Sequence, residues 1–340
     1  MNATSHLAAL SYEELVRELD ARQRSRRPED GQGLPPPDPA TREALAGADD
    51  AQVLALARRL EFRGEGDGGG ASTIYGRDNR RDIYTLSSPA HLRAAATAAA
   101  FVPLAAMTRR GPRFVLATQE YGPSLPLCPW ERFYRQPTVA VGTGFLVAED
   151  VLATAGHLAV ESHLWGPGRE PLTAFVFGFQ MLDPGRARTV IDADDVYFPR
   201  RVLLREWTTQ GPDWGLIQLD RPARGRPIAA VRHHGQVADR ARLYMLGYPC
   251  GLPEKYVGGA RVYANSAPSY FDADLDAYEI NSGSPVFNAA DDVVEGIAVR
   301  GNPRGDFRFR SKDNCFVSLR LPDWMAEEAC TRTTEFARFL

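Results

Sequence analysis

The sequence predicts a mainly β fold, with a helical segment at the N-terminus and a helix at the C-terminus. From Val139 onward, short strand-like runs alternate with turns that contain glycine or proline, which is typical of an all-β barrel. Within residues 1–63, apolar residues recur at near-helical spacing, which predicts two helices on either side of the Gly- and Pro-rich segment 31–37. The last stretch, residues 322–340, is expected to form a terminal helix with one apolar side.

A glycine-rich run marks a domain boundary. Residues 64–70 read Gly-Glu-Gly-Asp-Gly-Gly-Gly, and glycines carry high backbone entropy without any side chain to pack. The sequence therefore predicts a helical N-terminal segment at 1–63, a mobile linker at 64–73 and a second domain at 74–340. In that domain the alanine-rich run 90–106 is helix-prone, and the first clear barrel strand is expected at 113–118.

Composition narrows the class of protein. A chain of 340 residues with 44% hydrophobic and 24% charged residues can bury one large or two modest cores. Its formal net charge of −3 provides no basic field, so a nucleic-acid partner is not expected. No segment approaches the roughly 18 to 20 apolar residues of a membrane helix, and the first residues lack the basic start and apolar core of a signal peptide. We expect no membrane association and a cytoplasmic location.

Three short motifs supply the residues of a hydrolytic triad. His157 ends the string Ala-Thr-Ala-Gly-His, Asp213 opens Asp-Trp-Gly-Leu-Ile, and Ser282 lies in Asn-Ser-Gly-Ser-Pro. Each motif adjoins a strand-like run, where a rigid sheet can present a side chain from a loop. A nucleophilic serine needs an imidazole to take its proton, a buried carboxylate to fix the imidazole tautomer, and N–H groups that face the oxyanion. A Ser-Gly-x-Pro string alone would more simply be a turn, and the other two motifs favour the catalytic interpretation.

Ser282, rather than Ser284, is the expected nucleophile. A serine that precedes Gly283 can sit on a tight turn whose own amide and that of Ile280 point at one oxygen. The predicted oxyanion hole therefore consists of the backbone N–H groups of Ile280 and Ser282. Ser284 is expected to pack or to form a hydrogen bond nearby.

The order His, Asp, Ser is the chymotrypsin order, and residues 74 to about 322 resemble the bacterial glutamyl-endopeptidase-like branch of the chymotrypsin superfamily. The strings that carry the resemblance lie at 74–76, 78–82, 131–133 with 136–137, 175–179, 247–249 with 251–253, and 281–288. The resemblance implies a chymotrypsin-like double antiparallel β-barrel, with six strands in each barrel and the active site in the cleft between them. His157 and Asp213 would come from the first barrel and Ser282 from the second. It also implies a trypsin-like serine protease domain at 74–340 that cleaves protein or peptide substrates.

Two functions remain open because the chain departs from its relatives beside the nucleophile. Relatives usually carry Gly-Gly before the Asn-Ser pair, whereas this chain has Glu279 and Ile280. The β-branched Ile280 resists a positive φ and can twist its amide away from the oxyanion. The chain is therefore expected to be a serine endopeptidase, and the alternative is a catalytically weak or inactive, protease-derived protein-binding module.

Two positions bear on substrate preference. In the named family, selectivity for glutamate depends partly on a histidine, and Ala298 stands at the matching position. Asp276 lies six residues before the nucleophile, at the offset where trypsin places the carboxylate of its pocket floor. A buried carboxylate there predicts cleavage after Arg or Lys. Alternatively, Asp276 faces solvent or caps a turn.

The four cysteines bear on metal binding and on the cellular compartment. No two of them are close in sequence and no histidine stands near them at ligand spacing, so we expect no metal or other cofactor. Related secreted proteases place a disulfide around the catalytic histidine, and the matching positions here are Gly142 and Leu158. The missing pair favours a reducing compartment in which the thiols stay free, although pairing of Cys250 or Cys315 stays open.

The N-terminal segment 1–63 is expected to regulate the enzyme or to recruit a regulatory protein partner. In trypsin a freed N-terminal ammonium pairs with the aspartate before the nucleophile, and here that residue is the uncharged Asn281. Any regulation must therefore follow a route unlike that of trypsinogen.

Overall fold

The computed structural model describes residues 18, 21, 36, 38–47, 73–301, 305–321 and 326–340. The chain divides into two compact units, Met1–Gly69 and Gly70–Leu340, which are described separately. In the first unit, helix α3 (Pro39–Ala44) begins after Asp38, whose Oδ1 accepts the N–H of Ala40 at 2.9 Å. The two longer helices predicted for residues 1–63 lie almost entirely outside the described residues.

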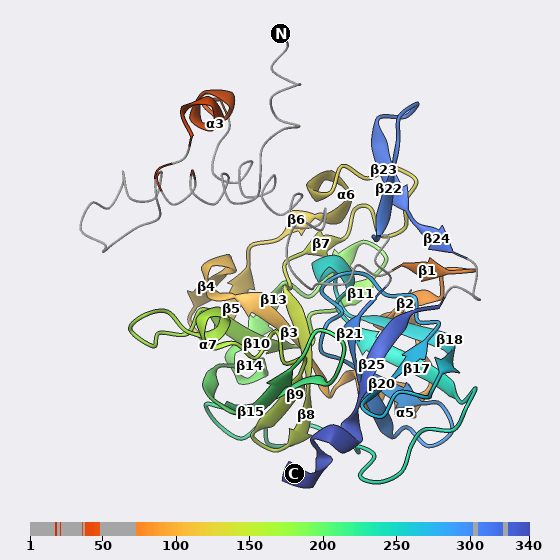
Figure 1. Ribbon diagram of the computed structural model, residues 1–340. Helices are drawn as coiled ribbons and strands as arrows, with labels where there is room; N and C mark the ends of the chain where they lie inside the picture. The colour runs from red at the N-terminus through yellow and green to blue at the C-terminus, as the bar shows by residue number, and fades with distance from the viewer. Residues whose placement is uncertain are drawn as a thin grey trace. The chain divides into compact units, whose positions relative to one another are not determined.

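The second unit contains two large sheets, and the first is an antiparallel, curled sheet of seven strands. Across the sheet these are β14 (Val196–Tyr197), β10 (Thr173–Phe177), β3 (Ala98–Pro103), β8 (Gly142–Ala148), β9 (Val151–Thr154), β16 (Asp213–Leu219) and β15 (Pro199–Trp207) (Figure 1). Its strands are rich in β-branched and aromatic residues, and their side chains fill one core with Phe101, Leu146, Phe175 and Ile217 fully or almost fully buried.

The second sheet of this unit closes into a barrel. Six strands follow one another around it, namely β17 (Arg242–Gly247), β20 (Ser284–Asn288), β21 (Val294–Arg300), β25 (Glu328–Arg332), β19 (Tyr270–Ala273) and β18 (Lys255–Ala264). The pairing of β17 with β18 closes the ring, and β2 (Arg80–Asp82) adds to β18 from outside. The predicted mainly β class is confirmed: this unit contains one curled sheet of seven strands and one closed barrel of six.

Shorter elements surround the two sheets. One is a three-stranded sheet of β4 (Met107–Arg110), β5 (Arg113–Leu116) and β13 (Val190–Asp192). The others are strand pairs: β1 (Ile74–Tyr75) with β24 (Arg320–Leu321), β6 (Gln119–Glu120) with β7 (Pro137–Thr138), β11 (Met181–Asp183) with β12 (Arg186–Ala187), and β22 (Phe307–Arg310) with β23 (Cys315–Ser318). The short helices are α5 (Pro89–Ala95), α6 (Tyr121–Ser124), α7 (Glu161–Leu164), and the 3-10 helices η1 (Ile83–Thr85), η2 (Leu104–Ala106), η3 (Ala193–Asp195) and η4 (Pro249–Gly251).

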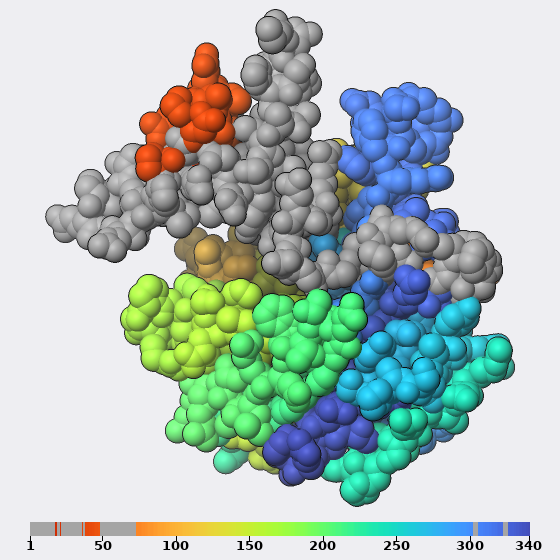
Figure 2. Space-filling model, viewed as in Figure 1, coloured from red at the N-terminus to blue at the C-terminus, as the bar shows by residue number. Residues whose placement is uncertain are grey.

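The C-terminal helix expected over 322–340 is wrong. Residues 328–332 form β25, and two 3-10 helices follow, η6 (Thr333–Glu335) and η7 (Ala337–Phe339). The strand is buried throughout because it pairs with β21 on one side and β19 on the other. After it, Phe336 packs against Trp214 of the first sheet, and in Figure 2 the dark blue C-terminal residues lie between the green and cyan surfaces. Sheet pairing has overridden the helical periodicity.

The alanine-rich run 90–106 is only partly helical. Helix α5 ends at Ala95, and Ala98–Pro103 form β3 in the middle of the first sheet. Small side chains suit this position because β3 is paired on both edges and buried along nearly its whole length. The strand expected at 113–118 exists as β5, but it belongs to a separate three-stranded sheet.

The structure joins two of the four cysteines. A disulfide connects Cys128 with Cys315 at the start of β23, and Cys250 and Cys330 are buried free thiols. This corrects the expectation of free thiols at Cys128 and at Cys315, whose pairing the sequence left open, and it removes the cysteine argument for a reducing compartment. In the part of the chain that the structure describes, no helix has the length and apolar character needed to cross a membrane.

Candidate active site

His157 and Asp213 lie at neighbouring strand ends in the first sheet. Strand β9 ends three residues before His157, and Asp213 is the first residue of its partner β16. The Nδ1 atom of His157 is 2.8 Å from Asp213 Oδ2, and the backbone N–H of His157 donates to Asp213 Oδ1 at 3.0 Å. Asp213 is 1% exposed. A proton on Nδ1, held by this buried carboxylate, leaves Nε2 as the basic nitrogen of the imidazole.

The turn before His157 requires a glycine. A Cβ atom on Gly156 would lie 2.1 Å from the carbonyl oxygen of Glu206 and 2.8 Å from that of Trp214. The backbone of the histidine loop therefore packs directly against the strands that border Asp213. The second barrel also contributes, because the N–H of Asp213 donates to Thr331 Oγ1 at 3.1 Å.

Ser282 lies on a tight turn just before β20. The N–H of Asn281 donates to the carbonyl of Tyr278 at 3.1 Å, and the N–H of Ser284 donates to that of Asn281 at 2.9 Å. Gly283 has a φ of 89°, and a Cβ there would lie 1.9 Å from the carbonyl oxygen of Thr143 in β8. The glycine after Ser282 is thus needed both for its backbone conformation and for the close approach of the two sheets.

Two threonines connect the serine turn with the histidine loop. The N–H of Thr143 donates to the carbonyl of Ser282 at 3.0 Å, and Thr143 Oγ1 donates to the carbonyl of Ile280 at 3.2 Å. Thr154 Oγ1, three residues before His157, donates to the carbonyl of Thr143 at 2.7 Å. The structure thereby ties the Ser282 turn to the strand that leads to His157.

The two predicted oxyanion donors, the backbone N–H groups of Ile280 and Ser282, lie on the same turn. Ile280 has a φ of 73°, although a β-branched residue resists this conformation. Its side chain is half-buried against the cluster that includes Ala140 and Tyr248, and its carbonyl is held by Thr143. Among the described residues, neither the N–H of Ile280 nor that of Ser282 has a hydrogen-bond partner. Both donors are therefore available to an oxyanion.

The surroundings of the two serines differ. Ser284 is fully buried, with Oγ 3.4 Å from Asn281 Oδ1, whereas Ser282 is partly exposed. A Cβ on Gly247 would lie 2.0 Å from Ser284 Oγ, so this hydroxyl is packed against the neighbouring strand. The environment favours Ser282 as the reactive serine.

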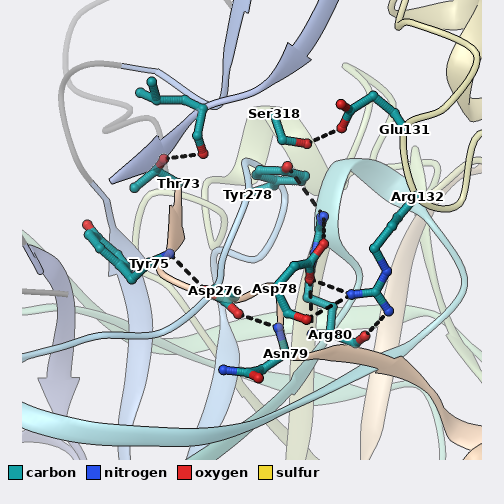
Figure 3. A network of polar contacts seen from close by, with 11 residues as sticks. Thr73, Tyr75, Asp78, Asn79, Arg80, Glu131, Arg132, Asp276, Tyr278 and Ser318 are labelled. Carbon is teal, nitrogen blue, oxygen red and sulfur yellow. Dashed lines mark hydrogen bonds and ion pairs between the residues drawn. The ribbon is translucent and has the colours of Figure 1, made fainter. Parts of the chain in front are cut away.

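Asp276 has a different role from the predicted pocket floor. Its Oδ1 accepts the N–H of Tyr75 at 2.8 Å and its Oδ2 accepts the N–H of Asn79 at 2.6 Å, as Figure 3 shows. Burial raises the pKa of Asp276 to about 7, because loss of hydration outweighs these two hydrogen bonds. With both oxygens engaged by the first residues of the second unit, Asp276 anchors that segment, and the basis for an Arg or Lys preference is lost.

Ala298 lies in β21 beside the serine turn. It is 5% exposed, it pairs with Ser284, and its carbonyl accepts the N–H of Gly283 at 2.8 Å. Its methyl group provides no polar atom for an acidic substrate side chain.

The site residues that the sequence analysis did not identify are Thr143, Thr154 and Thr331, because hydroxyl contacts between distant strands leave no local signal in the sequence.

A polar network joins the start of the second unit to the segment before Ser282 (Figure 3). Arg80 donates to Asp78 through Nε at 3.0 Å and through Nη2 at 2.9 Å. Its guanidinium carbon is 4.0 Å from the centre of the Tyr278 ring. Arg132 also pairs with Asp78, at 2.8 Å. The network fixes residues 78–80 against Tyr278, four residues before Ser282.

A known protein family matches the part of the chain that contains the candidate site. Residues 142–297, which contain His157, Asp213 and Ser282, match the family model of the trypsin-like peptidase domain. The matched segment contains all three motifs, and the match supports their resemblance to trypsin-like peptidases.

The chain is similar to many solved structures, among them the following two. One is a Glu endopeptidase in complex with MPD, at 12% identity and a TM-score of 0.44, with 78% of this chain and 96% of that chain covered. The other is the inactive form of a serine-to-alanine mutant of Rv3671c from M. tuberculosis H37Rv, at 12% identity and a TM-score of 0.38, with 78% and 94% covered. No curated protein sequence matches the chain.

Proposed function

We propose that the protein is a serine endopeptidase that cleaves protein or peptide substrates through an acyl-enzyme. The observation that carries this proposal is the buried Asp213 carboxylate, 2.8 Å from Nδ1 of His157, in a domain that also presents Ser282 on a braced turn. A substrate peptide is the natural target of a trypsin-like peptidase domain.

In the proposed mechanism, Nε2 of His157 takes the proton of Ser282 Oγ as this oxygen attacks the scissile carbonyl. Asp213 keeps the proton on Nδ1 and stabilises the imidazolium that forms. The N–H groups of Ile280 and Ser282 donate to the oxyanion of the tetrahedral intermediate. The imidazolium then protonates the leaving amine, and water, activated by the same imidazole, hydrolyses the acyl-enzyme.

A fluorophosphonate probe tests the proposal, because it reacts only with an activated serine. Labelling of the wild-type protein that disappears in Ser282→Ala, and persists in Ser284→Ala, supports the enzyme and this assignment of the nucleophile. Loss of labelling in Ser284→Ala alone contradicts the assignment. A wild-type protein that no probe labels contradicts the proposed function.

The second candidate is a protein-binding module with weak or no turnover. Ile280 favours it, because its φ of 73° is strained for a β-branched residue and a relaxed Ile280 would turn its N–H away from the oxyanion. The same probe separates the two candidates. Binding of peptides without labelling or cleavage supports the module.

We also propose that the N-terminal segment regulates the enzyme or recruits a regulatory partner. Asp276 gives a physical reason, because it binds the backbone of Tyr75 and Asn79, which follow shortly after that segment in the chain. The test compares the full chain with a truncated protein that begins at Ser72, each with and without candidate partners. Equal activity and equal substrate range in both proteins would contradict a regulatory role.

A further inference from the structure

The residue before Ile280 is held through both of its backbone groups. The N–H of Glu279 donates to Asp306 Oδ2 at 2.8 Å, and the carbonyl of Glu279 accepts the N–H of Cys250 at 2.7 Å. This carbonyl and the N–H of Ile280 belong to one planar peptide group. The bond to Cys250 therefore sets the direction of the Ile280 donor, and the bond to Asp306 fixes the peptide group before it.

Asp306 is built into the fold at the root of the β22–β23 hairpin. It is 4% exposed, and its carbonyl accepts the N–H of Leu319 at 2.7 Å. This bond joins the residue that precedes β22 to the residue that follows β23. The Sγ of Cys250 lies 3.9 Å from Asp306 Oδ2, so the two residues that hold Glu279 also contact each other. A buried carboxylate that accepts a backbone N–H forms one of the stronger kinds of hydrogen bond.

The hairpin itself is tied to the loop that follows α6, beside which it lies in Figure 1. The disulfide joins Cys315 to Cys128, the N–H of Phe316 donates to the carbonyl of Pro126 at 2.9 Å, and the N–H of Cys128 donates to that of Phe316 at 2.8 Å. Asp306 thus projects from a firmly anchored element onto the turn that carries the nucleophile.

The backbone strain at Ile280 explains why the hydrogen bond between Glu279 and Asp306 matters. A non-glycine residue held at positive φ relaxes unless its surroundings fix the backbone on both sides. Thr143 fixes the carbonyl of Ile280, whereas Cys250 and Asp306 fix the residue before it. Loss of the Asp306 carboxylate removes one of these restraints and frees the Tyr278–Glu279 peptide group to rotate.

We propose that Asp306 is a positioning residue of the oxyanion hole, which acts on the transition state through the backbone of Glu279 and Ile280. The inference rests on the proposed serine-protease function. Asp306 touches no reacting atom. Its role is to keep the Ile280 N–H directed at the oxyanion, so its removal lowers turnover rather than substrate binding.

The experiment compares Asp306→Ala and Asp306→Asn with wild type in the full chain, and Asp313→Asn serves as the matched control. Asp313 is an acidic residue of the same hairpin that pairs with Arg310 at 2.9 Å, away from Glu279. The measurements are the rate constant of fluorophosphonate labelling at Ser282, kcat and KM on a cleaved reporter peptide, and amide hydrogen exchange over residues 278–284.

Since loss of one oxyanion donor costs about 10²–10³-fold, we expect Asp306→Ala, which only loosens a donor, to lower kcat and the labelling rate about 10- to 100-fold with little change in KM. Exchange of the Glu279 and Asn281 amides should accelerate. Asp306→Asn retains a carbonyl acceptor and should fall between Asp306→Ala and wild type, and it decides the matter if Asp306→Ala does not fold. Asp313→Asn should match wild type.

The outcomes separate this inference from the function on which it rests. A labelled wild type with unchanged kcat and exchange in both Asp306 variants overturns the inference alone. Equal losses in the Asp306 and Asp313 variants also overturn it, because they would reflect general damage to the hairpin. A wild type that is never labelled overturns the proposed function, and the positioning role falls with it.

Discussion

The two halves of the candidate site are held in different ways. His157 and Asp213 are joined by two direct hydrogen bonds between residues at adjacent strand ends. The Ser282 turn is shaped instead by separate contacts from Thr143, Cys250 and Asp306, which belong to three different segments of the chain. The first half depends on one pair of side by side strand ends, and the second depends on how several segments meet. Small structural changes should therefore affect the serine turn more than the histidine pair.

The largest expected effects come from the triad itself. Ser282→Ala and His157→Ala should each abolish peptide hydrolysis with the fold intact, since both residues act in one proton-transfer unit. Asp213→Asn should lose slightly less, about 10⁴-fold in kcat, because the wrong imidazole tautomer is then favoured. Hydrolysis of a reporter peptide and circular dichroism measure activity and fold. Ser284→Ala is the control and should retain activity.

The disulfide should affect stability more than chemistry. A variant with Cys128→Ser and Cys315→Ser lacks a bridge between residues 187 positions apart, and we expect a loss of about 2–4 kcal/mol in unfolding free energy. Denaturant titration measures this loss. Cys330→Ser, which changes a free thiol, is the control for substitution of a buried cysteine. A reductant should lower the stability of wild type and leave the double variant unchanged, and the opposite pattern would contradict the pairing.

Thr143 tests the contact between the two halves. Thr143→Val keeps the shape of the side chain but removes the hydroxyl that donates to the carbonyl of Ile280, whereas Thr143→Ser keeps it. A buried hydrogen bond of this kind contributes about 1 kcal/mol, and an unpaired carbonyl adds to the cost. We expect Thr143→Val to lower kcat about tenfold, and Thr143→Ser to lie close to wild type. A loss in Thr143→Ser without a loss in Thr143→Val would indicate that the methyl group, not the hydroxyl, is required.

The same contrast explains what could be predicted from sequence. The strands around Phe145, Leu152 and Leu216 were predicted because apolar runs end at polar motifs, and short-range patterns carry that information. Strand β3 was missed because alanine favours helix, and only its pairing with β8 and β10 makes it a strand. The Cys128–Cys315 pair, and the hydrogen bonds of Asp276 and Asp306, depend on segments brought together by the fold, which spacing along the chain does not reveal.

The smallest effect, and the sharpest test of the serine turn, is expected at Ile280. With a φ of 73°, Ile280 is strained, and glycine adopts this conformation without steric cost. We expect Ile280→Gly to stabilise the turn by about 1 kcal/mol and to maintain or raise kcat. It should also reduce the effect of Asp306→Ala, because a glycine donor needs less restraint from its neighbours. A double-mutant cycle on kcat measures this coupling, with Ile280→Val as the control that keeps the β-branch. Independent effects of the two substitutions would show that Asp306 does not act through the backbone at Ile280, and a loss of activity in Ile280→Gly would show that the isoleucine side chain itself is needed at the site.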